Sequence, residues 1–222
     1  MAEKPGLLIR AWNVLLQRGP LSVAETVITR VAHFIYEHHE GYILERDLHE
    51  PIEQLQAKTP CECKFLETDE EIDQVATVFS NRPREDIKGM LDAGKRCVIV
   101  KAGEKVVRVG WSDSGDVYLP KPSGRVFSKK KLVTFPEGYA YTEGSYTLPE
   151  ERRKGYTNAC DSFHLLALAE LGFHKVITTI ACKNEPMLRG AKKTGHRLTK
   201  RVNYCRILGI RFRKVEDVTE PD

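Results

Sequence analysis

The chain has 222 residues, 41% of them hydrophobic and 30% charged, and its 35 Lys and Arg against 31 Asp and Glu give a formal net charge of +4. This composition is typical of a globular protein and argues against a disordered, collagen-like or low-complexity chain. No apolar run approaches the roughly 20 residues that a membrane-spanning helix needs, so we expect a soluble protein without a membrane partner. The small positive charge permits anionic ligands but identifies none.

Six cysteines are scattered along the chain rather than spaced as a disulfide framework, which predicts reduced thiols and a cytoplasmic protein. No small-residue cleavage site follows the short apolar stretch near the N-terminus, so we expect no signal peptide. Cys61 and Cys63 could contribute to a zinc site with His38 and His39, but a second close pair of ligands is missing. We therefore expect no metal.

The first fifty residues predict a helical extension. Apolar residues recur at helical spacing, Gly19-Pro20 interrupts the pattern, and Ser22 can cap a second helix that continues to Ile35. Residues 41–48 fit a strand or an extended connection. We expect the extension to pack on the main domain or on a partner subunit, because its polar faces are not densely basic enough for a membrane surface.

A polar stretch between Pro51 and Pro60 is the best domain boundary in the sequence. It divides the chain into the helical extension (residues 1–50), one domain (residues 57–216) and a short C-terminal tail (residues 217–222). A domain of this size can bury its own core.

Strand and helix patterns alternate after this boundary. The expected strands are residues 61–67, 95–111 as a hairpin, 138–148, 175–183 and 196–216, and the expected helices are residues 68–79, 83–94, 158–171 and 185–195. Thr68 and Glu71 have the spacing of a capping box at the start of the first helix. Residues 112–137 predict a long connection or an irregular hairpin. The order predicts an α/β fold of the α+β type, with a mixed, largely antiparallel central sheet and helices on both faces.

The most informative segment joins the predicted strand 138–148 to the next helix. Pro149 ends the strand, and Gly155 allows a tight turn that can approach a ligand closely. The first N–H groups of a helix have no partner within it, so together with the side chains of Arg152 to Lys154 they form a site suited to a diphosphate. A solvated basic loop is the alternative that charge alone leaves open. The turn lacks the Gly-Lys-Ser/Thr ending of a P-loop.

At this segment the sequence resembles the GNAT superfamily of acyl-coenzyme A dependent N-acyltransferases. The six residues from Arg152 to Thr157 stand where the family has Arg/Gln-x-x-Gly-x-Gly/Ala, and Thr147-Leu148-Pro149-Glu150 resembles the strand end before it. The stretch NEPMLRGAKKTGHR (184–197) is similar to the family's second landmark, an Asn that opens a helix ending in Lys-x-Gly-Phe. The resemblance covers residues 60–216 and implies a GNAT-like fold.

The resemblance also implies a binding site for acetyl-coenzyme A or another acyl-coenzyme A as co-substrate. The turn would hold the pyrophosphate, the strand before it would splay from its neighbour and bind the pantetheine arm, and an Asn would contact the cofactor near the thioester. The implied positions are Arg152, Arg153, Lys154, Gly155, Tyr156 and Thr157 for the pyrophosphate, Tyr146, Thr147 and Leu148 for the arm, and Asn184 near the thioester.

Three positions depart from the family pattern. Thr157 replaces a small Gly or Ala, so its side chain would crowd the phosphate or bond to it. His196 takes the place of the usual Phe, which we interpret as a packing change. Ala191 stands where many members have the Tyr that protonates the leaving thiolate. Tyr204 or Cys205 could replace that missing acid, although such residues more often serve packing.

Transfer of an acyl group to an amine needs a base, which family members often draw from the central strand. Glu143 lies four residues before Thr147, so strand alternation predicts that both side chains share one face with Tyr141 and Ser145. Glu143 is therefore the candidate catalytic base. A surface strand carboxylate is the equal alternative, because alternation does not identify the face that carries the cleft.

The sequence thus predicts an N-acyltransferase, and more specifically an N-acetyltransferase, that moves an acyl group from acyl-coenzyme A directly to a primary amine of a small molecule or peptide. A non-catalytic acyl-coenzyme A binding module is the alternative, motivated by Ala191 and Thr157. A basic adaptor is weaker: the basic series in residues 192–214 could bind nucleic acid, but a solvated face is the default. The sequence is compatible with a homodimer.

Overall fold

The computed structural model describes residues 36–78, 82–114, 117–118, 131–133, 136–208 and 210–218. The strands are β1 (Tyr36–Asp47), β2 (Glu62–Phe65), β3 (Arg96–Ala102), β4 (Lys105–Asp113), β5 (Val117–Tyr118), β6 (Lys131–Val133), β7 (Tyr139–Thr147), β8 (Lys175–Ala181), β9 (Arg197–Ile207) and β10 (Ile210–Asp217). The helices are α3 (Asp69–Val78), α4 (Arg84–Asp92), the short 3-10 helix η1 (Pro149–Glu151), α5 (Tyr156–Glu170) and α6 (Glu185–Lys193).

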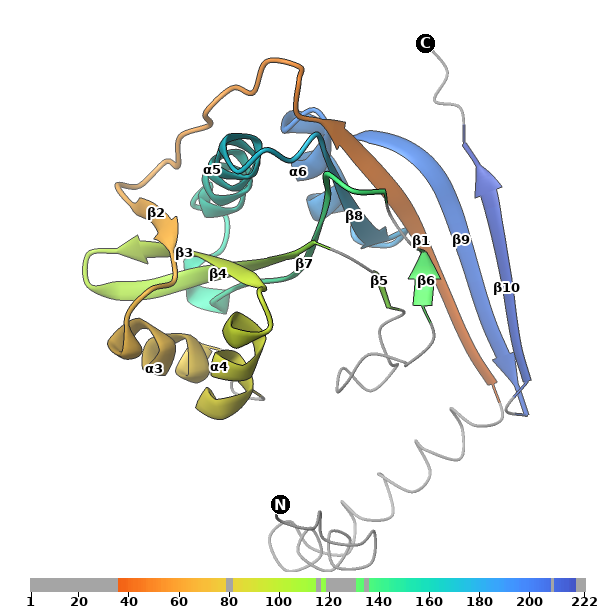
Figure 1. Cartoon of the computed structure of the whole chain (residues 1–222), viewed down its shortest axis with the longest axis horizontal. Helices are drawn as coiled ribbons and strands as arrows, with labels where there is room; N and C mark the ends of the chain where they lie inside the picture. The colour runs from red at the N-terminus through yellow and green to blue at the C-terminus, as the bar shows by residue number, and fades with distance from the viewer. Residues whose placement is uncertain are drawn as a thin grey trace, which may run out of the picture. The chain divides into compact units, whose positions relative to one another are not determined.

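Eight of these strands form one sheet in the order β10-β9-β1-β8-β7-β4-β3-β2. The pairs β2–β3, β3–β4 and β4–β7 are antiparallel, whereas β7 and β8 are parallel. The helices α3 and α4 lie on one face of this part of the sheet, and α5 and α6 lie on the other (Figure 1). The predicted fold class, a mixed and largely antiparallel sheet with helices on both faces, is therefore confirmed.

The contacts divide the described chain into two units. The larger unit contains residues 42–200 with residues 217 and 218, and the smaller unit contains residues 36–41 and 201–216. All the helices and the strands from β2 to β8 belong to the larger unit.

Each helical layer of the larger unit has its own apolar core. On one face, Ile72 of α3 and Ile87 of α4 pack with Trp111 of β4. On the other face, Tyr156 and Cys160 of α5 pack against the valines of β3 and β4. Because β4 is covered on both faces, its sequence is apolar on both faces rather than alternating, apart from Arg108.

The strand β1 lies within the predicted N-terminal extension. Tyr36–Asp47 form a strand hydrogen-bonded beside β8, which confirms the strand alternative given for residues 41–48 and shows that the helical character expected of the first fifty residues does not extend to residues 36–47. Lys175 Nζ of β8 lies 3.0 Å from the Glu45 carboxylate of β1. The predicted helices up to Ile35 lie outside the described residues, and the limits 1–50, 57–216 and 217–222 stay predictions.

Local sequence signals are confirmed after β1. The Thr68 hydroxyl accepts a hydrogen bond from the Glu71 N–H at 3.2 Å, and the Glu71 carboxylate accepts one from the Thr68 N–H at 3.2 Å. This is the reciprocal capping box expected at the start of α3. The β3–β4 hairpin is also as predicted. In the expected irregular hairpin of residues 112–137, β5 pairs antiparallel with β6.

A β-bulge lies in β7. Val109 of β4 pairs with Tyr146, and Trp111 pairs with Glu143, so β7 carries one residue more than β4 between the same two pairs. Gly144, inside the bulge, has φ of +61°. This left-handed conformation costs a glycine little and a residue with a side chain more, which explains the glycine here.

The bulge makes the predicted strand alternation wrong. Glu143 faces the α3 and α4 side, because its partner Trp111 is part of the core there. Thr147 faces the α5 side, where it accepts a hydrogen bond from Arg108. Ser145 lines a cavity with residues of α5 and α6. The candidate base and the two following hydroxyl side chains therefore lie on opposite faces of the sheet.

We expect the bulge to be sensitive to a single methyl group. A Cβ at Gly144 would lie 3.4 Å from Trp111 Cδ1 on a left-handed backbone, so Gly144→Ala should lower the free energy of unfolding by about 1–2 kcal/mol. Gly89 of α4 is the matched control: nothing lies within 4 Å of its added Cβ, and Gly89→Ala should stabilise by about 0.5–1 kcal/mol. Urea unfolding of both variants measures the difference; equal stability of the two would contradict this account of Gly144.

Candidate functional site

The ladder between β7 and β8 is short. It runs from the pair Tyr139–Lys175 to the pair Thr142–Thr178, where the Thr178 hydroxyl donates to the Thr142 carbonyl at 3.1 Å. The rest of both strands is described but does not continue this ladder, so the two strands part after Thr142. The resemblance implies such a separation for the strand that would bind the pantetheine arm.

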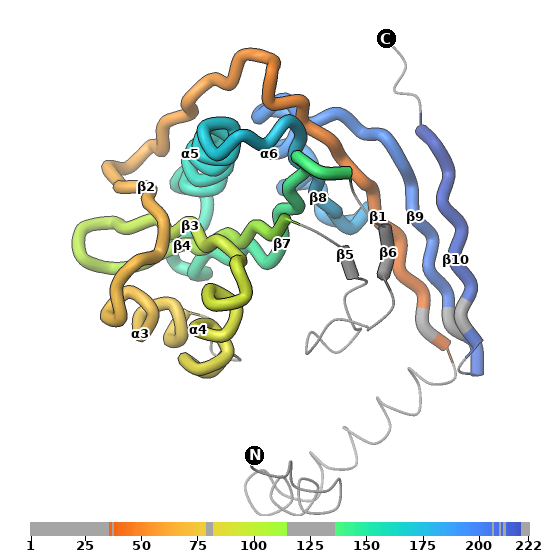
Figure 2. The backbone as a smooth tube through the Cα atoms, in the orientation of Figure 1, coloured from red at the N-terminus to blue at the C-terminus, as the bar shows by residue number. Residues whose placement is uncertain are grey.

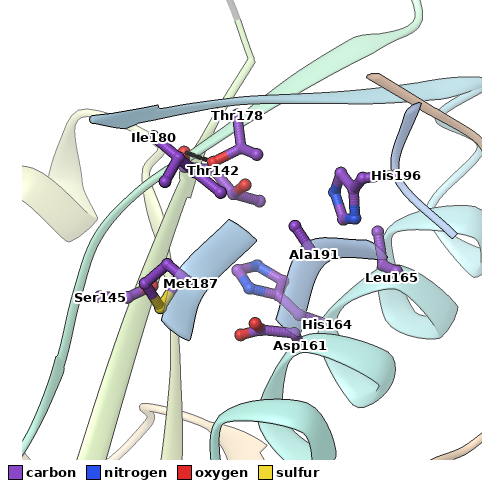
Figure 3. Close-up of a pocket in the computed structure, with 10 residues that line it drawn as sticks. All are labelled: Thr142, Ser145, Asp161, His164, Leu165, Thr178, Ile180, Met187, Ala191 and His196. Atoms are coloured by element: carbon purple, nitrogen blue, oxygen red, sulfur yellow. Dashed lines mark hydrogen bonds between the residues drawn. The ribbon is translucent and has the colours of Figure 1, made fainter. Parts of the chain in front are cut away.

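A cavity lies at this separation, between the two strands and the helices α5 and α6 (Figure 3). Its lining residues are Thr142, Ser145, Asp161, His164, Leu165, Thr178, Ile180, Met187, Ala191 and His196. The volume open to the centres of water molecules is ≈ 40 Å³, enough for roughly three of them. Polar groups from β7, β8, α5 and the turn before β9 therefore converge on a small, mostly enclosed space.

The buried His164 is one of the two histidines that line this cavity. His164 Nε2 lies 2.8 Å from the buried Ser112 hydroxyl, and burial, with the charges of Arg108 and Arg96, lowers the pKa of His164 to about 3. This imidazole is therefore neutral at physiological pH. One turn earlier in α5, burial raises the pKa of the Cys160 thiol to about 11, which makes the thiol a poor nucleophile.

Arg108 is a residue that the sequence analysis missed. It is 2% exposed, and its guanidinium donates to the Thr147 hydroxyl and to the Asp161 carboxylate, each at 2.9 Å. These bonds connect β4, β7 and α5 and hold Asp161 at the cavity wall. An Arg inside the apolar run of β4 was the available signal, because a cation buried between two layers needs a partner.

The turn before α5 presents a row of backbone donors. Within the described part of the chain, the N–H groups of Arg153 to Asn158 donate to no acceptor. Arg153 has φ of +67° and Gly155 has φ of +87°, so the turn folds back on itself before the helix begins. Unpaired N–H groups at the positive end of a helix dipole attract an anion.

The close approach that Gly155 allows is to the protein's own backbone. Lys58 N donates to Lys154 O at 2.9 Å, and a Cβ at Gly155 would lie 3.1 Å from Lys58 N and 3.2 Å from Ala57 Cα. The segment that contains these two residues leads from β1 to β2 and passes α5, as the tube in Figure 2 shows. We expected Gly155 to make room for a ligand. In the structure, the space beside it is filled by the backbone of Ala57 and Lys58.

The basic side chains of the turn have different surroundings. The guanidinium of Arg152 lies 6.0 Å from the centre of the Tyr146 ring, and its Nε donates to the Thr147 carbonyl at 3.4 Å. Lys154 Nζ donates to the Glu151 carboxylate at 2.8 Å. Arg153 is exposed. The two arginines therefore supply the positive charge that remains for a ligand.

The other residues implied for the cofactor occupy the ends of neighbouring elements. Thr157 Cγ2 lies 3.9 Å from the position of a Cβ on Gly190, so its methyl group packs on α6 rather than crowding the turn. Tyr156 is buried in the α5 core. The Leu148 N–H donates to Val107 O at 3.0 Å and is used within the sheet.

Asn184 caps α6. Its side-chain oxygen accepts a hydrogen bond from the Met187 N–H at 3.4 Å, and the residue is exposed. A capping Asn satisfies one of the unpaired N–H groups at a helix start. Its contact with a thioester stays a prediction from the resemblance.

Glu143 is part of a charged cluster with two residues that the sequence did not indicate. Lys95 Nζ lies 2.6 Å from the Glu143 carboxylate and 2.9 Å from the Asp113 carboxylate. Burial lowers the pKa of Lys95, but the hydrogen bonds and charges of the two carboxylates outweigh it and raise the pKa overall. Two carboxylates thus share one ammonium group on the α3 and α4 side of the sheet.

The two tyrosines named in the sequence analysis lie in different units. Tyr141 of the larger unit bonds through its hydroxyl to the Thr179 hydroxyl at 2.6 Å, and burial raises the pKa of Tyr141 to about 12. Tyr204, the candidate acid, belongs to the smaller unit, where its ring stacks on His39 with 6.2 Å between centroids. It is not among the residues that the larger unit brings together.

No family model and no curated protein sequence matches this chain. Solved structures do match its fold. A putative GNAT-family acetyltransferase from Novosphingobium aromaticivorans has a TM-score of 0.51 at 11% identity over 76% of this chain and 63% of that one. The GCN5-related N-acetyltransferases from Sphaerobacter thermophilus and Kribbella flavida have TM-scores of 0.54 and 0.51, at 10% and 12% identity, over 86% and 84% of this chain.

The chain has the GNAT fold. It spans 63%, 56% and 63% of the length of these three structures, in the order given. At this level of identity the similarity concerns the GNAT fold and leaves the reaction to be argued from the residues of this chain.

The described residues contain neither a candidate metal-binding group nor a candidate membrane-spanning helix. In the residues described, no three or more His, Cys, Asp or Glu side chains form a group that could hold a metal ion. None of the described helices is long and apolar enough to cross a membrane. All six cysteines are free thiols.

The buried histidine of α5 predicts a loss of stability in acid. His164 stays neutral when folded but takes up a proton at its ordinary pKa when unfolded, so the unfolded chain binds more protons below about pH 6.5. The free energy of unfolding should therefore fall by about 1.4 kcal/mol per pH unit from this group as pH drops, until pH approaches 3. Burial lowers the pKa of His196 as well, which adds to the effect.

Thermal unfolding of His164→Gln at pH 7 and pH 4.5 measures this effect. The variant should lose less stability between the two pH values than the wild type. Exposed His174 provides the control, and His174→Gln should keep the wild-type difference. An unchanged pH dependence in His164→Gln would contradict the assignment.

Proposed function

We propose that this protein is an N-acyltransferase, and specifically an N-acetyltransferase, that moves an acyl group from acyl-coenzyme A directly to a primary amine. Two features of the larger unit carry the proposal. The strand β7 parts from β8, and the N–H groups of the turn before α5 have no acceptor among the described residues. In the GNAT fold these are the places for an arm and a diphosphate.

The residues present fit an acyl-coenzyme A. The N–H groups of Arg153 to Asn158, with the side chains of Arg152 and Arg153, offer donors and charge to a pyrophosphate. Tyr146 and Thr147 lie on the part of β7 beyond its ladder with β8, where backbone groups can bind the amides of a pantetheine arm. When bound, acyl-coenzyme A supplies an acyl group activated as a thioester.

The acceptor amine is proposed to meet Glu143. With Asp113 it makes two carboxylates around the ammonium of Lys95, and carboxylates attract a cationic amine. Glu143 then takes the proton from the amine, directly or through water, so that the nitrogen can attack. Tyr204 stays a candidate acid on sequence grounds alone, and the cytoplasmic location and the homodimer stay predictions.

A non-catalytic acyl-coenzyme A binding module is the second candidate, because Ala191 at the cavity wall leaves no phenol for the thiolate. It predicts binding of acetyl-coenzyme A without transfer to any amine of a panel of aminosugars, polyamines and peptide N-termini. Transfer to one of these amines would exclude it.

Binding of the donor tests the first half of the proposal. Isothermal titration should give heat with acetyl-coenzyme A, and Arg152→Ala and Arg153→Ala should each raise the Kd by about tenfold, because each removes a charge-assisted contact. Lys88→Ala on α4, where Lys88 pairs with Asp69, is the control and should bind normally. No heat with wild type at high micromolar acetyl-coenzyme A would overturn the proposal.

Turnover of an accepted amine tests the role of Glu143. Glu143→Gln should lower kcat by about 100-fold or more while the Kd for acetyl-coenzyme A stays as in wild type, since a general base contributes to chemistry rather than to donor binding. The exposed Glu67, which pairs with Lys64, gives the control Glu67→Gln, expected to keep wild-type kcat. Wild-type turnover of Glu143→Gln across the pH range would remove this residue from the mechanism.

A further inference from the structure

One buried nitrogen in the cavity lacks a hydrogen-bond partner. His196 is 9% exposed, and its Nε2 makes no hydrogen bond in the described part of the chain. Figure 3 shows the imidazole turned toward Ala191 and the cavity. An unpaired polar atom in such a place destabilises the fold, so a ligand or water that satisfies it is favoured.

The neighbouring hydroxyl fixes the tautomer of this imidazole. Thr194 Oγ1 lies 3.0 Å from the Ala191 carbonyl, 3.4 Å from the Gly190 carbonyl and 3.0 Å from His196 Nδ1. Carbonyls can only accept, so a hydroxyl proton directed to either of them leaves the oxygen to accept from Nδ1. We assign the proton of the neutral imidazole to Nδ1 on this basis, which leaves Nε2 with a lone pair.

The other titratable groups around the cavity are less suited to accept a proton. His164 is held by Ser112, and the Asp161 carboxylate is paired with Arg108. Burial is the largest influence on His196 and lowers its pKa; of the charged groups around it, Asp161 favours protonation and Arg46 opposes it. The imidazole is therefore neutral at rest, so Nε2 can accept a proton, and it releases that proton readily.

We propose that His196 Nε2 is the proton carrier of the acyl transfer, in place of the phenol that is absent at Ala191. The inference rests on the proposed function. As the nitrogen–carbon bond forms, the amine nitrogen loses a proton to Nε2; as the carbon–sulfur bond breaks, Nε2 returns that proton to the sulfur. The imidazole ends neutral, and the proton that Glu143 removed beforehand is the one released to water.

The two faces of the sheet at β7 carry the two groups, which supports separate roles for Glu143 and His196. Glu143 lies on the α3 and α4 side of β7, whereas the cavity with His196 lies on the α5 and α6 side. The strands β7 and β8 part between them. A group seated in that parting can therefore meet the base from one side and the imidazole from the other.

Nitrogen NMR of the histidine side chains tests the inference without any turnover. The free protein should show His196 with a proton on Nδ1 and a bare Nε2, and saturating coenzyme A should shift the Nε2 resonance. The resonances of exposed His174 should not move, and His196→Asn assigns the signal. A proton on Nε2 in the free protein, or an unmoved resonance in saturating coenzyme A, would overturn the inference.

A kinetic comparison provides the second readout. His196→Asn keeps a donor to Thr194 but removes Nε2, so kcat should fall by about 100-fold or more with little change in the KM for acetyl-coenzyme A. A wild-type kcat in this variant would contradict the role of His196 but would not contradict the proposed function. Absence of coenzyme A binding to wild type, measured on the NMR sample by titration, would overturn both.

Discussion

The candidate site depends on one extra residue in β7. The bulge at Gly144 turns Glu143 toward α3 and α4 and turns Ser145 and Thr147 toward α5. Without it, regular alternation would place these side chains together on one face, and the charged cluster and the cavity could not lie on opposite sides of the same strand. The bulge also directly follows the last pair of β7 with β8, so the change of face and the parting of the strands coincide.

The buried guanidinium of Arg108 holds the elements around this point together. A cation that is removed from water must have its hydrogen bonds provided by the fold, and here they come from β7 and α5. Each of these bonds has an angular preference, which apolar packing does not have, so the bridge constrains how α5 lies against the strand. The turn leads into α5, the strand end belongs to β7, and both elements line the cavity, so this bridge affects how the three lie relative to one another.

The sequence predicted features that are determined by neighbouring residues better than features that depend on contacts between distant segments. The capping box at Thr68 and the turn around Gly155 are encoded within a few residues, and both are present. The bulge needed the register with β4, although a glycine inside a strand pattern was a signal of it. The strand β1 needed its neighbour β8, because short segments of mixed character take the conformation that their partners stabilise.

The charged cluster illustrates the same limit at the site. Lys95 and Glu143 are 48 residues apart in sequence and 2.6 Å apart in the structure. Neither position carries a motif, and only the pairing of β4 with β3 and β7 brings them together. The tautomer assigned to His196 likewise rests on the contacts of the Thr194 hydroxyl with two carbonyls and Nδ1, which no spacing rule expresses.

The segment between β1 and β2 has a consequence for the order of folding. Its backbone is bonded to late parts of the chain, through Leu55 N to Ser162 Oγ and Lys58 N to Lys154 O. During synthesis these residues emerge roughly one hundred residues before their partners, so the first strand and its connection must wait unpaired. Such distant pairings slow folding, because a long loop must close before any bond forms. The turn proposed to bind the donor thus gains its contact with this segment only by closing a loop of about one hundred residues.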